Sequence, residues 1–327
     1  MDDIYIDALR GVLTDRCTLQ AVRDIEGGQS AEALWQAIEE SGFADALLPE
    51  VEGGAGLSLT EAFPLLELCG AFVVPVPLAE TMVARSLLAQ AGVPRPGGSI
   101  ALAQGRLQSD GTLVCERVSF GRVADWVLVG LGKTCLLLPV DAAVSAAAVA
   151  PLDATLSWSA PAQAVALPVP GVADVRVSLA CVLAAQLAGA LMSVFTRTLQ
   201  YANDRNQFGR PIGKFQAIQH QLGVISEHAF AARMAAQMGC STDRLRVAIA
   251  KARTSEAALE VAALSHSIHG AIGFTEEFDL QMYTRRLHAW RQAGGSESHW
   301  HDVVGAELVD SRDGLALDLI RATTDPA

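Results

Sequence analysis

The spacing of hydrophobic residues divides the chain into three parts. Over residues 1 to about 95, apolar side chains recur every three or four positions, which is the period of an amphipathic helix. Ser30 and Thr60 each precede such a stretch and are predicted N-caps. The pattern predicts four helices: Asp3–Leu13, Ser30–Ser41, Thr60–Gly70 and Thr81–Ala91. A turn-rich loop, Leu47–Gly56, separates the second helix from the third.

From about residue 97 to residue 170 the pattern changes to short apolar runs between Gly, Asp and Pro turns. Such runs are typical of strands in a small β-domain. The predicted strands are Leu113–Cys115, Trp126–Val129, Thr134–Leu138 and Ala164–Leu167.

From about residue 171 the helical period returns over much longer stretches. The predicted helices are Val177–Asn203, Phe215–Met238, Asp243–Ile268, Leu280–Ala289 and Ser298–Arg321. Long helices joined by short turns are typical of a bundle. The chain is therefore predicted to be mostly α-helical, with an N-terminal helical domain (1–96), a reduced β middle domain (97–170) and a C-terminal helical bundle (171–327).

Composition narrows the classes of function. The formal net charge of −12 and a pI near 5.0 argue against general nucleic-acid binding, which needs a basic face. The six cysteines are scattered without a C-x-x-C pair, so neither a disulfide framework nor a metal site is predicted. The acidic N-terminus carries no export signal, and a cytoplasmic location is expected.

One stretch is long enough to raise the question of a membrane span. Val177–Phe195 has no charged residue, but it is rich in alanine and lacks flanking aromatic residues. We therefore expect a helix buried inside a bundle rather than a span.

The segment Tyr201–Gln216 joins the longest predicted helix to the next one and carries the most distinctive chemistry. Arg205 offers a planar fork for phosphate, and Phe208 offers an apolar face for an aromatic ring. Gln216 lies in the first turn of the following helix, where free backbone N–H groups favour anions. On periodicity alone, the same residues also fit a plain turn between helices with a surface arginine.

A second segment, Ser267–Phe274, follows a predicted helix and contains two glycines that would let the backbone approach a ligand. A helix C-cap explains the same pattern.

Together these segments resemble the flavin-dependent acyl-CoA dehydrogenases. Tyr201–Gln216 is similar to their C-terminal signature, Ser267–Phe274 to their Q-x-x-G-G-x-G-F loop, and Leu47–Gly56 to their P-E-x-x-G-G-x-G loop. In that family these C-terminal residues contact the FAD of a neighbouring subunit. The resemblance implies a cofactor-binding role for Arg205, Phe208, Ile212, Gln216, Ser267, His269, Gly270 and Gly273.

The resemblance is incomplete in three places. Ser267 stands where the family has Gln, and Ala271 replaces a Gly. The middle part lacks the T-E-P-x-x-G-S-D loop that holds the flavin ring in the family, and the W-x-x-N-G hairpin as well.

The family's catalytic base is also missing. Members take the α-proton of an acyl-CoA with a Glu that must lie within hydrogen-bond reach of that carbon. The two positions where the family places this Glu are occupied by Gly294 and by Leu179, beside Ala180. Glu297 is the nearest carboxylate, and its position predicts a charge in the first turn of a helix rather than a base. No catalytic residue is predicted in this chain.

Three functions fit this sequence. The first is the non-catalytic subunit of a heteromeric α2β2 acyl-CoA dehydrogenase, which completes the FAD site of a catalytic partner that binds the acyl-CoA. The second is a flavin-dependent monooxygenase of the same fold, which tight FAD binding by the homo-oligomer would favour. The third is a non-enzymatic scaffold or thioester-binding homo-oligomer, which failure to bind FAD with any partner would favour.

Overall fold

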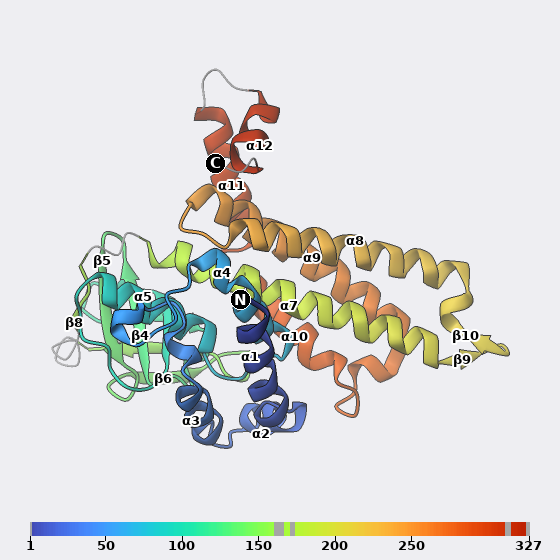
Figure 1. Ribbon diagram of the computed structural model, residues 1–327, viewed down its shortest axis with the longest axis horizontal. Coiled ribbons are helices and arrows are strands. Elements are labelled where there is room, and N and C mark those ends of the chain that lie inside the picture. Colours follow the sequence, from blue (N-terminus) through green and yellow to red (C-terminus); the bar gives the residue numbers. More distant parts are fainter. Residues whose placement is uncertain (1, 160–166, 171–173, 311–314, 325–327) are drawn as a thin grey trace.

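The computed structural model describes residues 2–159, 167–170, 174–310 and 315–324, and Figure 1 shows their arrangement. The N-terminal part is helical, as predicted. Its helices are α1 (Asp2–Arg16), α2 (Leu19–Glu26), α3 (Glu32–Ser41), α4 (Leu59–Ala71) and α5 (Leu78–Gln90), with short 3-10 turns η1 (Phe43–Asp45) and η2 (Glu50–Glu52). The short helix α2 is absent from the sequence-based prediction.

Helix α4 begins slightly earlier in the chain than the sequence predicted. Ser58, not Thr60, is its N-cap, because Ser58 and Glu61 form a reciprocal capping box. Thr60 instead donates from its hydroxyl to the carbonyl oxygen of Cys240 at 3.2 Å, which ties α4 to the far end of a later helix. At α3 the N-cap is Ala31, although the Ser30 hydroxyl accepts from the backbone N–H of Glu32.

Within its described residues, the middle part forms two four-stranded sheets. One has the order β1-β4-β5-β8, in which β1 and β4 are parallel, and the other has the antiparallel order β2-β3-β7-β6. The strands are β1 (Ile100–Gln104), β2 (Arg106–Leu107), β3 (Leu113–Val118), β4 (Trp126–Leu131), β5 (Thr134–Pro139), β6 (Val144–Ala147), β7 (Ala154–Trp158) and β8 (Leu167–Pro168). The predicted strand Ala164–Leu167 lies outside the described residues except for Leu167.

The C-terminal part is a bundle of long helices. They are α7 (Val175–Asp204), α8 (Gln216–Gly239), α9 (Arg244–His269), α10 (Leu280–Gln292), α11 (Glu297–Asp310) and α12 (Ala316–Thr324). Between α7 and α8 lie the short strands β9 (Asn206–Gln207) and β10 (Arg210–Pro211) and the turn η3 (Ile212–Lys214), and η4 (Gly270–Phe274) follows α9.

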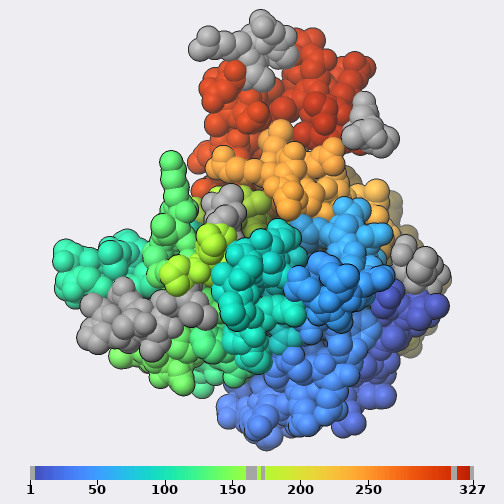
Figure 2. Space-filling model, turned by 60° about the vertical axis from the view of Figure 1, so that its left-hand side comes forward, coloured from blue at the N-terminus to red at the C-terminus, as the bar shows by residue number. Residues whose placement is uncertain are grey.

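The C-terminal end differs from the prediction. The sequence predicts one helix over Ser298–Arg321, whereas the structure has α11 and α12 as separate helices on either side of residues 311–314. Both project from the bundle, and Figure 2 shows this segment (red) standing above the rest of the molecule.

Helix α7 is the central helix of the molecule. It is long and apolar enough to cross a membrane, but 83% of its most apolar 18-residue stretch is buried inside the protein. It packs closely against α4, because a glycine on each helix lies directly against the other helix. A Cβ on Gly70 would lie 1.8 Å from the carbonyl oxygen of Gln186, and a Cβ on Gly189 would lie 1.9 Å from that of Glu67. This close crossing joins the N-terminal helices to the bundle in one hydrophobic core.

Candidate functional site

The two segments singled out in the sequence meet at one end of the bundle. Because α7, α8 and α9 run antiparallel, the end of α7, the start of α8 and the end of α9 lie together, and the β9–β10 hairpin forms the tip in Figure 1. Tyr201 near the end of α7 links them, because its ring stacks on His269 with centroids 4.2 Å apart. Its hydroxyl donates to the carbonyl oxygen of His269 at 3.3 Å.

The hairpin holds Phe208 in an unusual backbone conformation. Phe208 and Gly209 form a two-residue turn with φ values of 52° and 81°, the positive values that tight hairpins require. The left-handed region is unfavourable for a phenylalanine. Its ring is nevertheless 91% exposed, although it makes an edge contact with Phe215. An exposed aromatic ring on a strained turn is a surface available to a flat ligand.

Arg205 and Gln216 supply the polar part of this surface. The backbone of Arg205 closes the hairpin, since its N–H donates to Tyr201 and its carbonyl oxygen accepts from Ile212. Its guanidinium is exposed and has no ion-pair partner among the described residues. Helix α8 begins at the exposed Gln216, and its N-cap, Phe215, provides no side-chain hydrogen bond. Ile218 and Gln219 donate to the carbonyl oxygen of Phe215, which leaves the N–H groups of Gln216 and Ala217 in the first turn of α8 for an anion.

The η4 loop contributes mainly backbone. Gly270 has φ 66° and ψ −149°, a conformation open only to glycine, and it is exposed. Ser267 is exposed and accepts from the side-chain amide of Gln221 at 3.5 Å. The structure thus brings five of the eight predicted cofactor-binding residues to the surface at this end: Arg205, Phe208, Gln216, Ser267 and Gly270.

The other three predicted residues, Ile212, His269 and Gly273, are buried. The Nδ1 of His269 donates to the carbonyl oxygen of Ser265 at 2.7 Å, and burial lowers the pKa of His269. A neutral, stacked imidazole in this position shapes the loop. These three residues therefore offer little surface to a ligand in this conformation.

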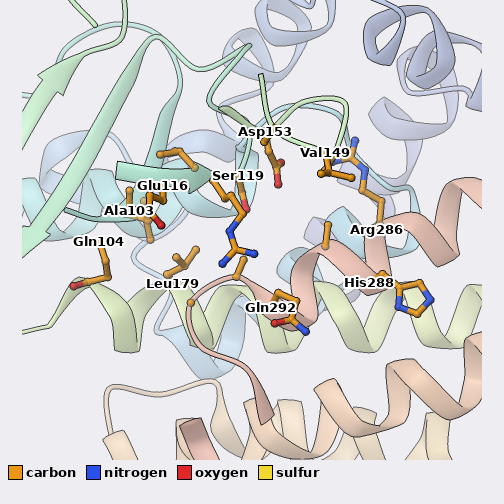
Figure 3. A pocket seen from close by; sticks show the side chains of 18 of the residues that line it. Ala103, Gln104, Glu116, Ser119, Val149, Asp153, Leu179, Arg286, His288 and Gln292 are labelled. Carbon is orange, nitrogen blue, oxygen red and sulfur yellow. The ribbon is translucent and has the colours of Figure 1, made fainter. Parts of the chain in front are cut away.

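A cavity of about 660 Å³ lies at the opposite end of α7. It is enclosed by β1, β3 and the β6–β7 loop on one side and by α7 and α10 on the other. Figure 3 shows Asp153 and Ser119 entering from the β side, while Leu179, His288 and Gln292 come from the helices.

The two positions that the sequence resemblance assigns to the catalytic base both border this cavity. Gly294 and Leu179 both line it, and a Cβ on Gly294 would lie 3.3 Å from the Cγ of Leu179. Gly294 has φ 66°, so any other residue there would be strained. Neither position carries a carboxylate in this chain.

The turn that carries Gly294 is held from behind by a buried lysine. The Nζ of Lys251 donates to the carbonyl oxygens of Arg291 and Gly295, each at 3.0 Å, and to the hydroxyl of Ser255 at 2.9 Å. Burial lowers the pKa of Lys251 to about 7. Glu297 lies in the first turn of α11, as predicted, and pairs with Arg291. Glu297 is not among the residues that line the cavity.

The charged groups of the cavity were not predicted from the sequence. Arg286 is buried and pairs through Nη2 with Glu26 at 3.0 Å. Asp153 comes from the β6–β7 loop, and burial raises its pKa to about 6. Arg117 comes from a bulge in β3. These residues lie far apart in the sequence, and none belongs to a motif that would have indicated the cavity.

The two regions are too far apart to act on the same small group. Leu179 lies near the start of α7 and Arg205 directly after its end. They are 26 residues apart along the chain (205 − 179), which at ~1.5 Å per helical residue is about 39 Å. None of the eight predicted cofactor-binding residues lines the cavity.

Comparison with known proteins agrees with this fold. Residues 179–308 match the model of the acyl-CoA dehydrogenase C-terminal domain. Acyl-CoA dehydrogenase IpdE2 of Mycobacterium tuberculosis is 32% identical over 263 residues, which span 80% of this chain and 82% of that protein.

Two solved structures share the fold over nearly the whole chain. The Tcur3481-Tcur3483 steroid ACAD is 24% identical with a TM-score of 0.83, covering 96% of this chain and 99% of that one. The ChsE4-ChsE5 complex of Mycobacterium tuberculosis is 21% identical with a TM-score of 0.80, covering 95% and 97%. The match to IpdE2, at 32% identity over 80% of this chain, shows that the chain belongs to the acyl-CoA dehydrogenase family.

Proposed function

We propose that this chain is the supporting subunit of a hetero-oligomeric acyl-CoA dehydrogenase. It completes the FAD site of a catalytic partner through the surface at the α7–α8 end of its bundle. The observation that carries this proposal is the separation described above. The residues resembling the family's FAD contacts lie about 39 Å along α7 from the cavity where the base should be, since each helical residue rises ~1.5 Å.

The missing base supports the same division of labour. Because Gly294 and Leu179 occupy the two family positions, this chain has no carboxylate there to take an α-proton. A subunit that presents cofactor contacts but no base needs a partner that provides the base, the rest of the flavin cradle and the acyl-CoA site.

The exposed residues at the bundle end fit a dinucleotide cofactor. The guanidinium of Arg205 and the uncapped start of α8 can hold phosphate oxygens, and Phe208 can pack against a ring. The open backbone at Gly270 allows close approach of a chain of phosphates. When bound, FAD supplies the hydride acceptor of the family's reaction, whereas this chain binds and orients it.

Two relatives of the same fold favour a heteromeric assembly and a bulky substrate. One solved structure is named as the ChsE4-ChsE5 complex, and the other joins two protein names and is called a steroid ACAD. We propose α,β-dehydrogenation of a steroid-derived or similarly bulky acyl-CoA by the complex.

The first test is FAD content. The chain is purified alone and co-expressed with a candidate catalytic acyl-CoA dehydrogenase subunit, and flavin absorbance is compared with protein concentration. We expect little flavin in the chain alone and about one FAD per heterodimer in the complex. Stoichiometric FAD in the chain alone, reduced by an acyl-CoA, would overturn the proposal and indicate a self-sufficient flavoenzyme.

The second test is Arg205→Ala in the complex. Loss of a charge-assisted phosphate contact, which contributes roughly 1.5–3 kcal/mol, should weaken FAD about tenfold to a hundredfold. Arg321→Ala removes an exposed arginine of α12 and is the matched control, for which FAD affinity should not change. Equal FAD affinity in both variants would remove Arg205 from the cofactor site.

A further inference from the structure

The cavity between the β sheets and α10 has no role in the function proposed above. Among the described residues, it is nevertheless lined by buried polar groups without partners and by several apolar side chains. We propose that it is a second, non-redox binding site, and that its ligand is an amphipathic carboxylate. The carboxylate meets Arg286 and Arg117, which together form the arginine wall of the cavity, and the apolar body lies along α7.

The arginine wall has more positive charge than its neighbours neutralise. Arg286 is 5% exposed, and its guanidinium lies over the rings of Phe120 and Trp290. Glu26 forms an ion pair with the Nη2 of Arg286 at 3.0 Å and accepts a hydrogen bond from Arg285 at 2.7 Å, so two guanidiniums share one carboxylate. The Nε of Arg286 has no hydrogen-bond partner in the described part of the chain.

Two further donors line the same cavity. The register of β3 shifts between Cys115 and Val118, and Arg117 within this bulge has φ 49°. The bulge lets two consecutive side chains, Glu116 and Arg117, both line the cavity. Glu116 is already paired with Arg106 at 3.2 Å, whereas no described residue pairs with the Arg117 guanidinium. The side-chain Nε2 of Gln104 is also buried and has no hydrogen-bond partner among the residues that the structure describes.

Unpartnered buried donors indicate a ligand that supplies acceptor oxygens. A buried amide or guanidinium N–H without a partner is destabilising, and a bound acceptor removes that cost. A planar guanidinium matches the two oxygens of a carboxylate. Aliphatic and small side chains from several elements also line the cavity, including Leu102, Val149, Leu179 and Ala289, and they suit an apolar body.

Asp153 makes this site dependent on pH. It faces Arg286 and Arg117, which lower its pKa, and it acts on the buried Glu80. Burial outweighs the arginines and raises the pKa of Asp153 to about 6. Below that pH, Asp153 is neutral and no longer repels a bound carboxylate, so binding should be tighter in mildly acidic solution. His288 also lines the cavity, and burial lowers its pKa, so it stays neutral near pH 7.

The experiment is calorimetric titration of the chain, alone and in its complex, with decanoate. Decanol is the neutral amphiphile of matched length, and inorganic phosphate is an anion without an apolar body. We expect decanoate to bind at least about tenfold more tightly than decanol, because the charge-assisted contacts are lost. Inorganic phosphate should not bind. Equal binding of decanol, or no binding of decanoate, would overturn the proposal.

Variants identify the cavity as the place of binding. Arg117→Gln should weaken decanoate about tenfold through the loss of one charge-assisted contact. Arg321→Gln, on the exposed face of α12, should have no effect. Asp153→Asn should tighten decanoate at about pH 7.5 and abolish the difference between about pH 7.5 and about pH 5.5. If Arg117→Gln and Asp153→Asn both leave binding unchanged, decanoate binds elsewhere and the proposal is wrong.

The outcome is independent of the proposed cofactor role at the bundle end. Arg205→Ala should weaken FAD binding but leave decanoate binding unchanged. Arg117→Gln should weaken decanoate binding but leave FAD binding unchanged. Displacement of decanoate by FAD would show that the cavity is a flavin site, which would overturn the non-redox assignment. Decanoate binding by a chain that takes no FAD with any partner would leave this inference standing while the proposed function failed.

Discussion

Glu80 shows how a single buried carboxyl affects this fold. It lies on α5, is completely buried, and accepts a hydrogen bond from the backbone N–H of Leu102 in β1 at 2.6 Å. Its second oxygen has no partner among the described residues. Burial outweighs the hydrogen bond and raises the pKa of Glu80 to about 8. At neutral pH the carboxyl is therefore mostly protonated.

This raised pKa predicts a pH-dependent stability. Between the usual pKa of 4.5 and about 8, the folded state binds more protons at Glu80 than the unfolded state does. The free energy of unfolding should therefore fall as pH rises through this window, by at most about 1.4 kcal/mol per pH unit. Glu80→Gln keeps an acceptor for Leu102 and cannot ionise.

Denaturant unfolding at several pH values measures the difference. We expect Glu80→Gln to be close to the wild type near pH 5 and more stable by roughly 1–3 kcal/mol near pH 8. Glu260→Gln, at an exposed position on α9, is the surface control. A Glu80→Gln difference that does not change with pH would contradict the raised pKa.

Single residues also mark the limit of what the sequence could predict about the candidate sites. Arg205, Phe208 and Gln216 lie within one short segment, so a motif could identify them. Arg117, Asp153 and Arg286 come from β3, a loop and α10, and only folding brings them to one cavity. No local sequence pattern links these three residues, so the sequence alone could not predict that they share a cavity.

At the scale of elements, the packing of α4 against α7 depends on two glycines. A Cβ on Gly189 would lie 1.9 Å from the carbonyl oxygen of Glu67, and backbone cannot move away as a side chain can. Gly189→Ala should therefore lower the free energy of unfolding by about 1–3 kcal/mol or more. Chemical denaturation measures this change.

The matched control is a glycine in an open helical position. A Cβ on Gly223 in α8 would meet nothing within 4 Å. Gly223→Ala should raise stability by roughly 0.5–1 kcal/mol, because alanine loses less backbone entropy. If Gly189→Ala were as well tolerated as Gly223→Ala, the crossing of α4 and α7 would be looser than the structure shows.

Long elements were predictable and short or capped ones were less so. The helices α7, α8 and α9 agree with the predicted ranges to within a few residues, because their apolar periodicity extends over many turns. Helix α2 has only eight residues, too few for a clear period. The start of α4 was misplaced because Thr60 fits the N-cap preference as well as Ser58 does, and only the contact with Glu61 distinguishes them.

At the scale of the whole molecule, α7 separates two surfaces of different chemistry. Its C-terminal end carries Arg205 and the hairpin, and its N-terminal end borders the cavity through Leu179. Sites separated by more than about 10 Å with no shared partners usually respond independently to mutation. The sequence could predict the three-part architecture but not this separation, because the cavity needs the β sheets and α10 in place.

Independence can be measured with a double variant. Arg205→Ala with Arg117→Gln should lose FAD affinity by the same factor as Arg205→Ala alone, and decanoate affinity by the same factor as Arg117→Gln alone. For each ligand, the change in binding free energy in the double variant should equal the sum of the changes in the two single variants within about 0.5 kcal/mol. A larger deviation would mean that α7 transmits a change from the cavity to the cofactor surface. In that case the carboxylate site would regulate FAD binding, and adding decanoate to the wild-type complex would change its FAD affinity by the same coupling factor.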